Sequence, residues 1–123
     1  MSQSREDYIK YIYEHSQNDQ LVSNKMIAQG LKISAPSVSE MIAKLAAENL
    51  VAYTPYQGME LTDSGRQMAQ DLIRKHEIWE YFLAKELNYN QVEVHELAEV
   101  LEHATPDDLA DRLAVYINYP EKN

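Results

Sequence analysis

Apolar side chains in the first half of the chain recur every three or four positions, which is the spacing of one helix face. This spacing predicts a helix over residues 4–17, a second helix capped by Ser23 and a third capped by Ser34. Pro36 is compatible with the third helix because proline is tolerated in a first turn. The positions expected to face a core are Tyr8, Ile9, Ile12, Tyr13, Met26, Ile27, Leu31, Val38, Met41, Ile42 and Leu45.

After Leu50 the helical spacing gives way to β-favouring residues and a turn. The predicted elements are a strand over 50–54, a turn over 55–58, a strand over 59–62, a helix capped by Thr62 or Ser64 that reaches about Leu87, and helices over 91–103 and 105–116. Three helices followed by a hairpin are the order of a winged helix-turn-helix. The chain is therefore predicted to be mainly α, with this DNA-binding fold over 1–63 and a helical domain over 64–123.

Composition narrows the class of protein. Of the 123 residues, 45% are hydrophobic and 25% are charged, which is ordinary for a folded globular chain. Cysteine is absent, which excludes disulfides, zinc–cysteine sites and cysteine nucleophiles. Because no apolar stretch approaches about 18 residues and the N-terminus lacks the apolar centre of a signal peptide, we expect a cytoplasmic protein without a membrane partner.

The formal net charge is −9, but it is unevenly distributed. Residues 21–60 carry three basic and three acidic side chains, whereas residues 61–123 carry six basic and thirteen acidic ones, a net charge of −7. A strongly acidic chain is repelled by nucleic acid. The neutral segment with the predicted helix-turn-helix stays compatible with DNA, and the acidic half is expected either to be a solvated surface or to bind cations.

The third predicted helix presents polar residues opposite its apolar stripe. Ser37, Glu40 and Lys44 share one face, which would enter a major groove. Serine hydroxyls and lysine suit phosphates and base edges, small apolar side chains can touch a thymine methyl, and the hairpin tip would meet the backbone or minor groove. The predicted DNA-binding residues are Lys25, Ser34, Ala35, Pro36, Ser37, Ser39, Glu40, Lys44, Tyr56 and Gln57.

Two residues depart from a simple DNA-binding pattern. Lys32 occupies the turn between the two helices, where glycine is commonest. The carboxylate of Glu40 is unfavourable near phosphates unless it accepts a hydrogen bond from a cytosine amino group. The alternative interpretation is that Ser34 only caps a helix and that the polar face is only solvated.

Histidines and carboxylates form a second pattern in the acidic half. His76 and Glu80 are four residues apart on the fourth predicted helix, and four further candidates follow one stripe of the fifth. Adjacent glutamates on a stripe repel each other unless a cation or a proton lies between them. The predicted metal ligands, with one on the first helix, are Asp7, His76, Glu80, His95, Glu99, Glu102 and His103. The alternative is a polar network between helices.

The ligand types indicate the metal. A site with oxygen and imidazole ligands and no thiolate suits Mn²⁺ or Fe²⁺. Zn²⁺ or Co²⁺ would also bind in vitro, because these ions bind most sites more tightly than Mn²⁺. Catalysis is not expected, because the segment 95–99 lacks the second histidine of a zinc-protease motif and no Glu-x-x-His pair of a di-iron bundle is present. The sequence also lacks a nucleophile elbow and a glycine-rich phosphate loop, so an enzyme is not predicted.

Five segments carry a family resemblance in order along nearly the whole chain: NKMIA (24–28), SAPSVSEMIAKL (34–45), LTDSG (61–65), RKHEIWE (74–80) and the region 95–103. Together they resemble the diphtheria-toxin-repressor / manganese-transport-regulator family of metal-activated transcriptional repressors. Their combination is far more specific than any one motif. The resemblance implies an N-terminal winged helix-turn-helix and a helical metal-binding and dimerisation domain.

The resemblance also implies roles for the predicted ligands. His76, Glu80 and His95 match a family site that receives further ligands from a third domain. Asp7, Glu99, Glu102 and His103 match a regulatory site that bridges the DNA-binding and helical layers. The position of Glu99 is cysteine in iron-type members and a carboxylate in manganese-type members, which agrees with the preference of oxygen ligands for Mn²⁺.

The chain departs from the family pattern in two respects. Lys10 stands where some short manganese regulators have an acidic ligand, and a protonated lysine cannot coordinate a metal. The longer manganese repressors, which the pattern resembles more, continue into an SH3-like domain. The chain is thus expected to be either a short member or the first two domains of a longer one, in which case the site of His76 would bind more weakly.

The resulting expectation is a homodimeric, Mn²⁺-dependent repressor that binds a palindromic operator in double-stranded DNA and controls metal-uptake genes. A metal ion between Asp7 and the helical layer would fix the spacing of the two recognition helices. Two alternatives stay open. One is a metal-independent winged-helix regulator whose helical layer only dimerises or binds an organic ligand, and the other is a metal-buffering protein with a vestigial DNA-binding domain.

Overall fold

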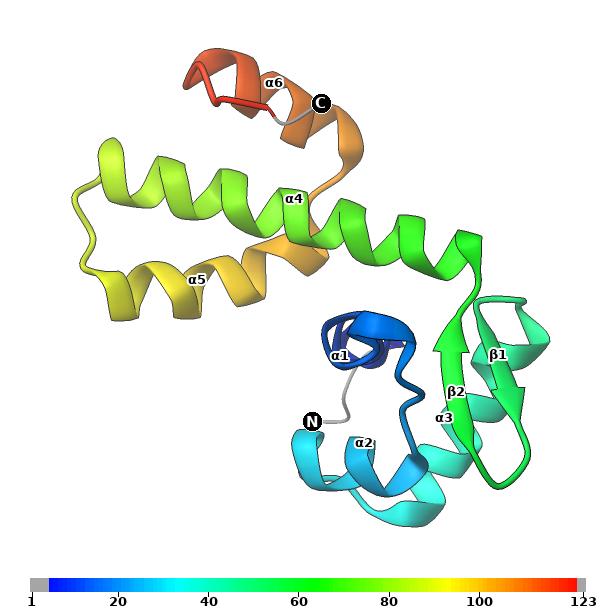
Figure 1. Cartoon of the computed structure of the whole chain (residues 1–123). Coiled ribbons are helices and arrows are strands. Elements are labelled where there is room, and N and C mark those ends of the chain that lie inside the picture. Colours follow the sequence, from blue (N-terminus) through cyan, green and yellow to red (C-terminus); the bar gives the residue numbers. More distant parts are fainter. Residues whose placement is uncertain (1–4, 122–123) are drawn as a thin grey trace. The chain divides into compact units, whose positions relative to one another are not determined.

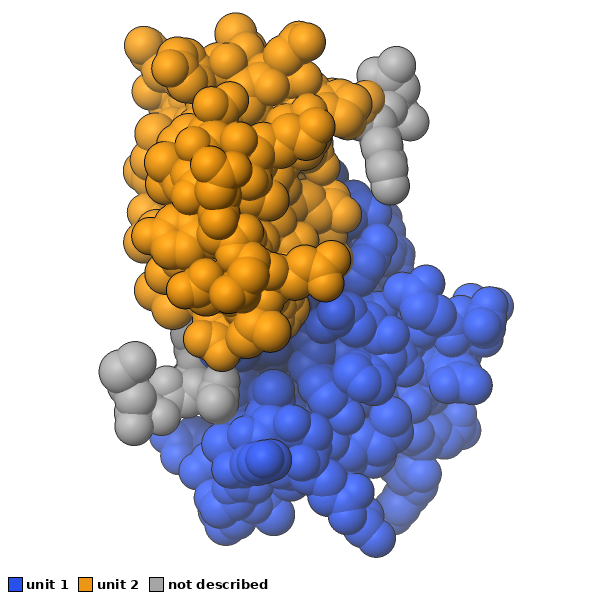
Figure 2. All heavy atoms as spheres, turned by 90° about the vertical axis from the view of Figure 1, so that its left-hand side faces the viewer, with its two compact units in different colours: residues 1–70 blue, residues 71–123 orange. Residues whose placement is uncertain are grey.

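The computed structural model describes residues 5–121, and the chain divides into two compact units, residues 1–70 and residues 71–123 (Figure 2). Its elements are α1 (Arg5–His15), the 3₁₀ helix η1 (Gln17–Asp19), α2 (Asn24–Leu31), α3 (Ala35–Ala47), β1 (Val51–Thr54), β2 (Gly58–Leu61), α4 (Asp63–Lys85), α5 (Gln91–Ala104) and α6 (Asp107–Tyr116) (Figure 1). The predicted order of helices and hairpin is confirmed. None of the described helices has the length and apolar character needed to cross a membrane.

The helix-turn-helix of the first unit begins at the predicted caps. The Ser23 hydroxyl accepts a hydrogen bond from the Met26 N–H at 3.1 Å, and the Ser34 hydroxyl accepts one from the Ser37 N–H at 3.3 Å. Between the two helices Lys32 has φ 57° and ψ 51°, a left-handed conformation. This conformation explains why glycine suits the position, since a side chain there carries a steric cost of about 1–2 kcal/mol.

A third segment, which the sequence did not predict, pairs with the hairpin. β1 pairs antiparallel with β2, so that Thr54 lies opposite Gly58, the residue expected in the turn. Val22 adds a single bridge to Met59 through backbone hydrogen bonds of 2.9 and 2.8 Å. Gly58 has φ 129°, and a Cβ there would lie 2.7 Å from the Val22 oxygen, so this close approach requires glycine.

The first unit has a continuous apolar core. α1 contacts α2 and β2, and α3 contacts α2 and β1. The buried residues are Tyr8, Ile9, Ile12, Val22, Ile27, Val38, Ile42, Leu45, Leu50, Val51, Met59, Leu61 and Ala69. Ala69 comes from the start of α4, and Met68 packs against the same core. The unit boundary therefore falls inside α4, several residues beyond the predicted domain boundary at 63.

The second unit contains the rest of α4 with α5 and α6. Asn90 caps α5 in a capping box with Glu93. α6 begins at Asp107 rather than at Thr105, because the backbones of Thr105 and Pro106 are extended, with ψ 113° and 154°. The Thr105 hydroxyl donates to the Leu101 carbonyl at the end of α5. A small core of Ile78, Ala110, Ala114 and Ile117 joins α4 to α6.

Candidate metal centre and DNA-binding surface

The imidazole of His76 is the centre of the polar cluster between α4 and α5. Its Nε2 lies 2.9 Å from the Glu80 carboxylate one turn further along α4. Its Nδ1 lies 2.6 Å from the Glu102 carboxylate and 4.0 Å from that of Glu99, both on α5. The Glu102 side chain is fully buried, and only 12% of the His76 side chain is exposed. His76 thus is largely buried and faces carboxylates from both helices, of which only that of Glu102 is fully buried.

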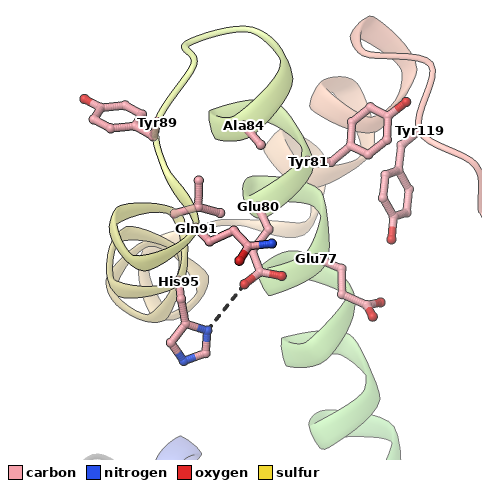
Figure 3. A pocket seen from close by; sticks show the side chains of 9 residues that line it. Glu77, Glu80, Tyr81, Ala84, Tyr89, Gln91, His95 and Tyr119 are labelled. Carbon is pink, nitrogen blue, oxygen red and sulfur yellow. Dashed lines mark hydrogen bonds and ion pairs between the residues drawn. The ribbon is translucent and has the colours of Figure 1, made fainter.

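His95 closes the cluster on its solvent side. Its Nδ1 lies 3.4 Å from the Glu80 carboxylate (Figure 3), and its Nε2 lies 3.5 Å from the Glu99 carboxylate. One ligand atom each from His76, His95 and Glu99 falls within 4.8 Å of the other two. These atoms are close enough to share one ion after small side-chain movements.

The surroundings of His76 favour a positive charge. Its hydrogen bond to Glu102 raises the pKa of His76 above the ordinary value, burial opposes this rise, and the charges of Glu80 and Glu102 support it. A protonated imidazole donates from both nitrogens and so fits both carboxylates. A metal ion would supply positive charge to the same carboxylates, and it would displace this proton because a histidine ligand must be neutral.

The two remaining predicted ligands, His103 and Asp7, belong to different units. The His103 Nε2 lies 3.6 Å from the second oxygen of Glu102. Six of the predicted ligands therefore form a connected series in the second unit: His76, Glu80, His95, Glu99, Glu102 and His103. The seventh, Asp7, belongs to α1 in the first unit, and its participation stays a prediction.

A cavity of about 610 Å³ adjoins this cluster (Figure 3). Glu80 and His95 form one side, and Glu77, Tyr81 and Tyr119 contribute to the rest of its lining. Burial, followed by the charge of Glu77, raises the pKa of Tyr119. Of this lining, the sequence singled out Glu80 and His95 but not Glu77, Tyr81 or Tyr119. The four-residue spacing of Glu77 and Tyr81 on one helix face could have indicated that they lie together, whereas no local pattern connects Tyr119 with α4.

The predicted DNA-binding side chains of α3 lie on the surface. Ser34, Ala35, Pro36, Ser37, Ser39, Glu40 and Lys44 are all exposed. The Ser34 hydroxyl donates to the Ser37 hydroxyl at 2.9 Å, beside a hollow of about 360 Å³ that Glu40 and Lys44 also line. The Asn24 amide donates to the Ser39 hydroxyl at 3.4 Å, a contact between α2 and α3 that sequence reasoning missed because the residues are fifteen positions apart.

The other predicted DNA-binding residues are also accessible. Lys25 is exposed near the start of α2. Tyr56 is fully exposed at the hairpin tip with φ 65°, and the Gln57 N–H donates to the Thr54 carbonyl at 3.1 Å across the turn. The tip therefore presents an aromatic side chain on a short, closed turn.

A winged helix-turn-helix joined to a helical unit with a histidine–carboxylate cluster defines the class of metal-responsive DNA-binding regulators. The chain belongs to the iron dependent repressor family: residues 1–59 match its N-terminal DNA binding domain, and residues 62–123 match its metal binding and dimerisation domain. The family resemblance drawn from the sequence is thereby confirmed, together with the two-part, mainly α fold.

Known relatives agree with this assignment. The chain is 34% identical over 118 residues to an HTH-type transcriptional regulator of Methanocaldococcus jannaschii, covering 95% of this chain and 94% of that one. It is 48% identical to the solved manganese regulator SloR, with a TM-score of 0.83, covering 98% of this chain and 56% of that one. A manganese-dependent transcriptional repressor solved with manganese is 40% identical, with a TM-score of 0.84 and coverages of 98% and 55%. This chain thus spans about half the length of these solved chains.

Proposed function

We propose that this protein is a Mn²⁺-dependent transcriptional repressor that binds operator DNA as a homodimer and controls metal-uptake genes. The observation that carries the proposal is the cluster around His76, where imidazoles and carboxylates from two helices converge within ligand distance of one another. Solved relatives described as a manganese regulator and a manganese-dependent repressor support the metal. The relatives are regulators, and we propose a regulatory rather than an enzymatic role for this chain in the cytoplasm.

The donor set fits a divalent cation. His76 and His95 offer imidazole nitrogen, and Glu80, Glu99 and Glu102 offer oxygen, with no thiolate in the chain. Such ligands suit Mn²⁺ or Fe²⁺, and Zn²⁺ or Co²⁺ is expected to bind in vitro. When bound, the ion supplies two positive charges beside residues 61–123, which carry a net charge of −7.

The DNA-binding part of the proposal rests on the first unit. The exposed face of α3 would enter the major groove while Ser34, Lys44 and the hairpin tip contact the backbone. In a two-fold dimer the spacing of the two α3 helices must match two half-sites about one helical turn apart, which predicts a palindromic operator. A metal ion that binds the competent arrangement more tightly than other arrangements shifts the population toward it.

We further propose that the dimer forms through α5. Val92 and Val100 are 68% and 69% exposed and lie two turns apart on this helix. The family description of this region includes dimerisation. Val100→Glu is expected to yield monomers in sedimentation experiments, whereas Val115→Glu on α6 is expected to leave the dimer intact. Dissociation by the α6 variant alone would assign the interface to α6 instead.

The proposed function is tested by operator binding against Mn²⁺ concentration in chelator-treated protein. Wild-type protein is expected to bind only with Mn²⁺, and His76→Ala and His103→Ala are expected to need more metal or to fail. Asp7→Ala tests the predicted seventh ligand in the same titration, since loss of the metal response with an intact fold would assign it to the site.

The same titration separates the alternatives. Equal DNA binding with and without metal would favour a metal-independent regulator and would reduce the cluster to a polar network. Tight Mn²⁺ binding without DNA affinity would favour a metal-buffering protein.

A further inference from the structure

The exposed face of α3 is made almost entirely of short side chains. Pro36, Ser37, Ser39 and Ala43 are exposed on it and allow the helix to approach a flat or concave partner closely. Glu40 is the one acidic residue of this helix, and it stands among them. Its carboxylate, with the Lys44 ammonium one turn further on, therefore projects beyond these short side chains on the face of a recognition helix that meets base edges.

Glu40 contributes little to the stability of the fold. The face is held from behind by Val38, Ile42 and Leu45, which are buried. The Glu40 carboxylate lies 3.8 Å from the Lys44 ammonium, and the two side chains are 75% and 63% exposed. Exposed ion pairs four residues apart on a helix contribute only about 0.3–0.5 kcal/mol. An acidic group on a DNA-facing surface is otherwise unfavourable, because it approaches phosphates.

The chemistry of a carboxylate selects one base in the major groove. An ionised glutamate only accepts hydrogen bonds, and the donors in that groove are the amino groups of cytosine and adenine. Adenine places its N7 acceptor beside its amino group, which repels the second carboxylate oxygen, whereas cytosine has no such acceptor. Guanine and thymine offer only acceptors at this edge. Lys44 beside Oε1 offsets repulsion from phosphates and leaves Oε2 to accept from a base.

We propose that Glu40 determines operator specificity by accepting a hydrogen bond from the N4 amino group of a cytosine in each half-site. This assignment rests on the proposed function, because it requires that the chain bind operator DNA.

The test begins with selection of preferred duplexes from a random library by the Mn²⁺-loaded wild-type chain. Each base pair of the selected half-site is then replaced by the other three, and binding is measured for wild type, Glu40→Gln and Glu40→Ala. Wild type is expected to lose about 5- to 150-fold in affinity when one particular cytosine is replaced. Glu40→Gln is expected to prefer adenine at that position, since glutamine pairs with adenine N6 and N7, and Glu40→Ala is expected to discriminate poorly there.

Lys25→Ala is the matched control, because Lys25 is an exposed predicted phosphate contact on α2, outside the helix that carries Glu40. It is expected to weaken binding to all duplexes equally and to reduce the salt dependence, without changing base preference. Unchanged base preference at every position in both Glu40 variants would overturn the assignment while leaving the proposed function intact. Failure of the Mn²⁺-loaded wild type to select any duplex would overturn both.

Discussion

The two units of the chain use polar side chains differently. In the first unit most polar groups cap helices or lie on the surface, and among the described residues the interior is apolar apart from the largely buried Lys10. In the second unit the apolar core between α4 and α6 is small, and Glu102 and Thr105 are buried. Thr105 is satisfied by hydrogen bonds from Trp79 and to Leu101, whereas Glu102 carries a formal charge beside His76.

The buried carboxylate of the second unit indicates that a cation affects the folding stability of this unit more than that of the first. A buried carboxylate is unfavourable unless a positive charge or hydrogen-bond donors compensate it. His76 supplies such compensation when it is protonated, and a metal ion would supply it in the loaded protein. The apolar core of the first unit holds no buried carboxylate among the described residues. The second unit is therefore expected to respond to metal, and the helix-turn-helix much less.

The largest predicted effect is stabilisation of the second unit by Mn²⁺. At a free metal concentration about a thousand times the Kd, binding contributes about 4 kcal/mol to the stability of the bound unit. Hydrogen exchange is expected to slow in residues 71–104 and to change little in residues 24–47 when chelator is replaced by Mn²⁺. Equal slowing in both segments would contradict independent responses of the two units.

The next effect concerns the charge on Glu102. Glu102→Gln keeps the shape of the side chain but removes a carboxylate that contacts His76 at 2.6 Å. Mn²⁺ affinity, measured by calorimetry, is expected to fall about 10- to 100-fold, the loss typical of groups that support metal ligands. Thermal unfolding of the metal-free variant is expected to change less, because the glutamine amide can still form a hydrogen bond with a neutral His76 imidazole.

The matched control for this experiment is Glu86→Gln, an exposed residue directly after α4, which is expected to keep wild-type affinity. If Glu102→Gln also kept wild-type affinity, Glu102 would be a structural group rather than part of the metal site.

Within each unit, the sequence predicted helix caps and helix faces better than contacts between residues that are far apart along the chain. Serine spacing located the caps at Ser23 and Ser34, and helical periodicity placed six candidate ligands on two helices. The bridge between Val22 and Met59 was missed, because one residue of strand leaves no alternating pattern. The resemblance grouped Glu99 with Glu102 and His103, and this grouping stays a prediction. The structure adds that the Glu99 carboxylate lies 3.5 Å from His95, a contact that the sequence did not predict. Such distances depend on how α4 packs on α5, which periodicity does not specify.

A smaller effect is predicted in the turn of the first unit. Lys32 has a left-handed backbone, so Lys32→Gly removes a steric cost of about 1–2 kcal/mol but adds about 0.4–1 kcal/mol of freedom to the unfolded chain. The net stabilisation is expected to be about 0.5 kcal/mol in urea unfolding, with unchanged Mn²⁺ affinity. Asn49→Gly is the control at another left-handed position, where asparagine is already tolerated and little gain is expected. Destabilisation by Lys32→Gly would show that the lysine side chain contributes more than its backbone strain costs.

The smallest predicted effect is a pH dependence at the start of α6. The Lys75 ammonium lies 2.9 Å from the Asp107 carboxylate, and the hydrogen bond and charge of Lys75 lower the pKa of Asp107 below its ordinary value. A carboxyl group whose pKa is lowered by folding stabilises the folded state above its unfolded pKa, and this contribution is lost as the pH falls through the folded pKa. The difference in melting temperature between wild type and Asp107→Asn is therefore expected to be present at pH 6 and to shrink below about pH 4.

In a Lys75→Met background the same substitution is expected to show little of this pH dependence, because the partner that lowers the pKa is gone. A pH dependence that persisted in that background would assign it to the N-terminal end of α6, where negative charge is also favoured, rather than to the ion pair.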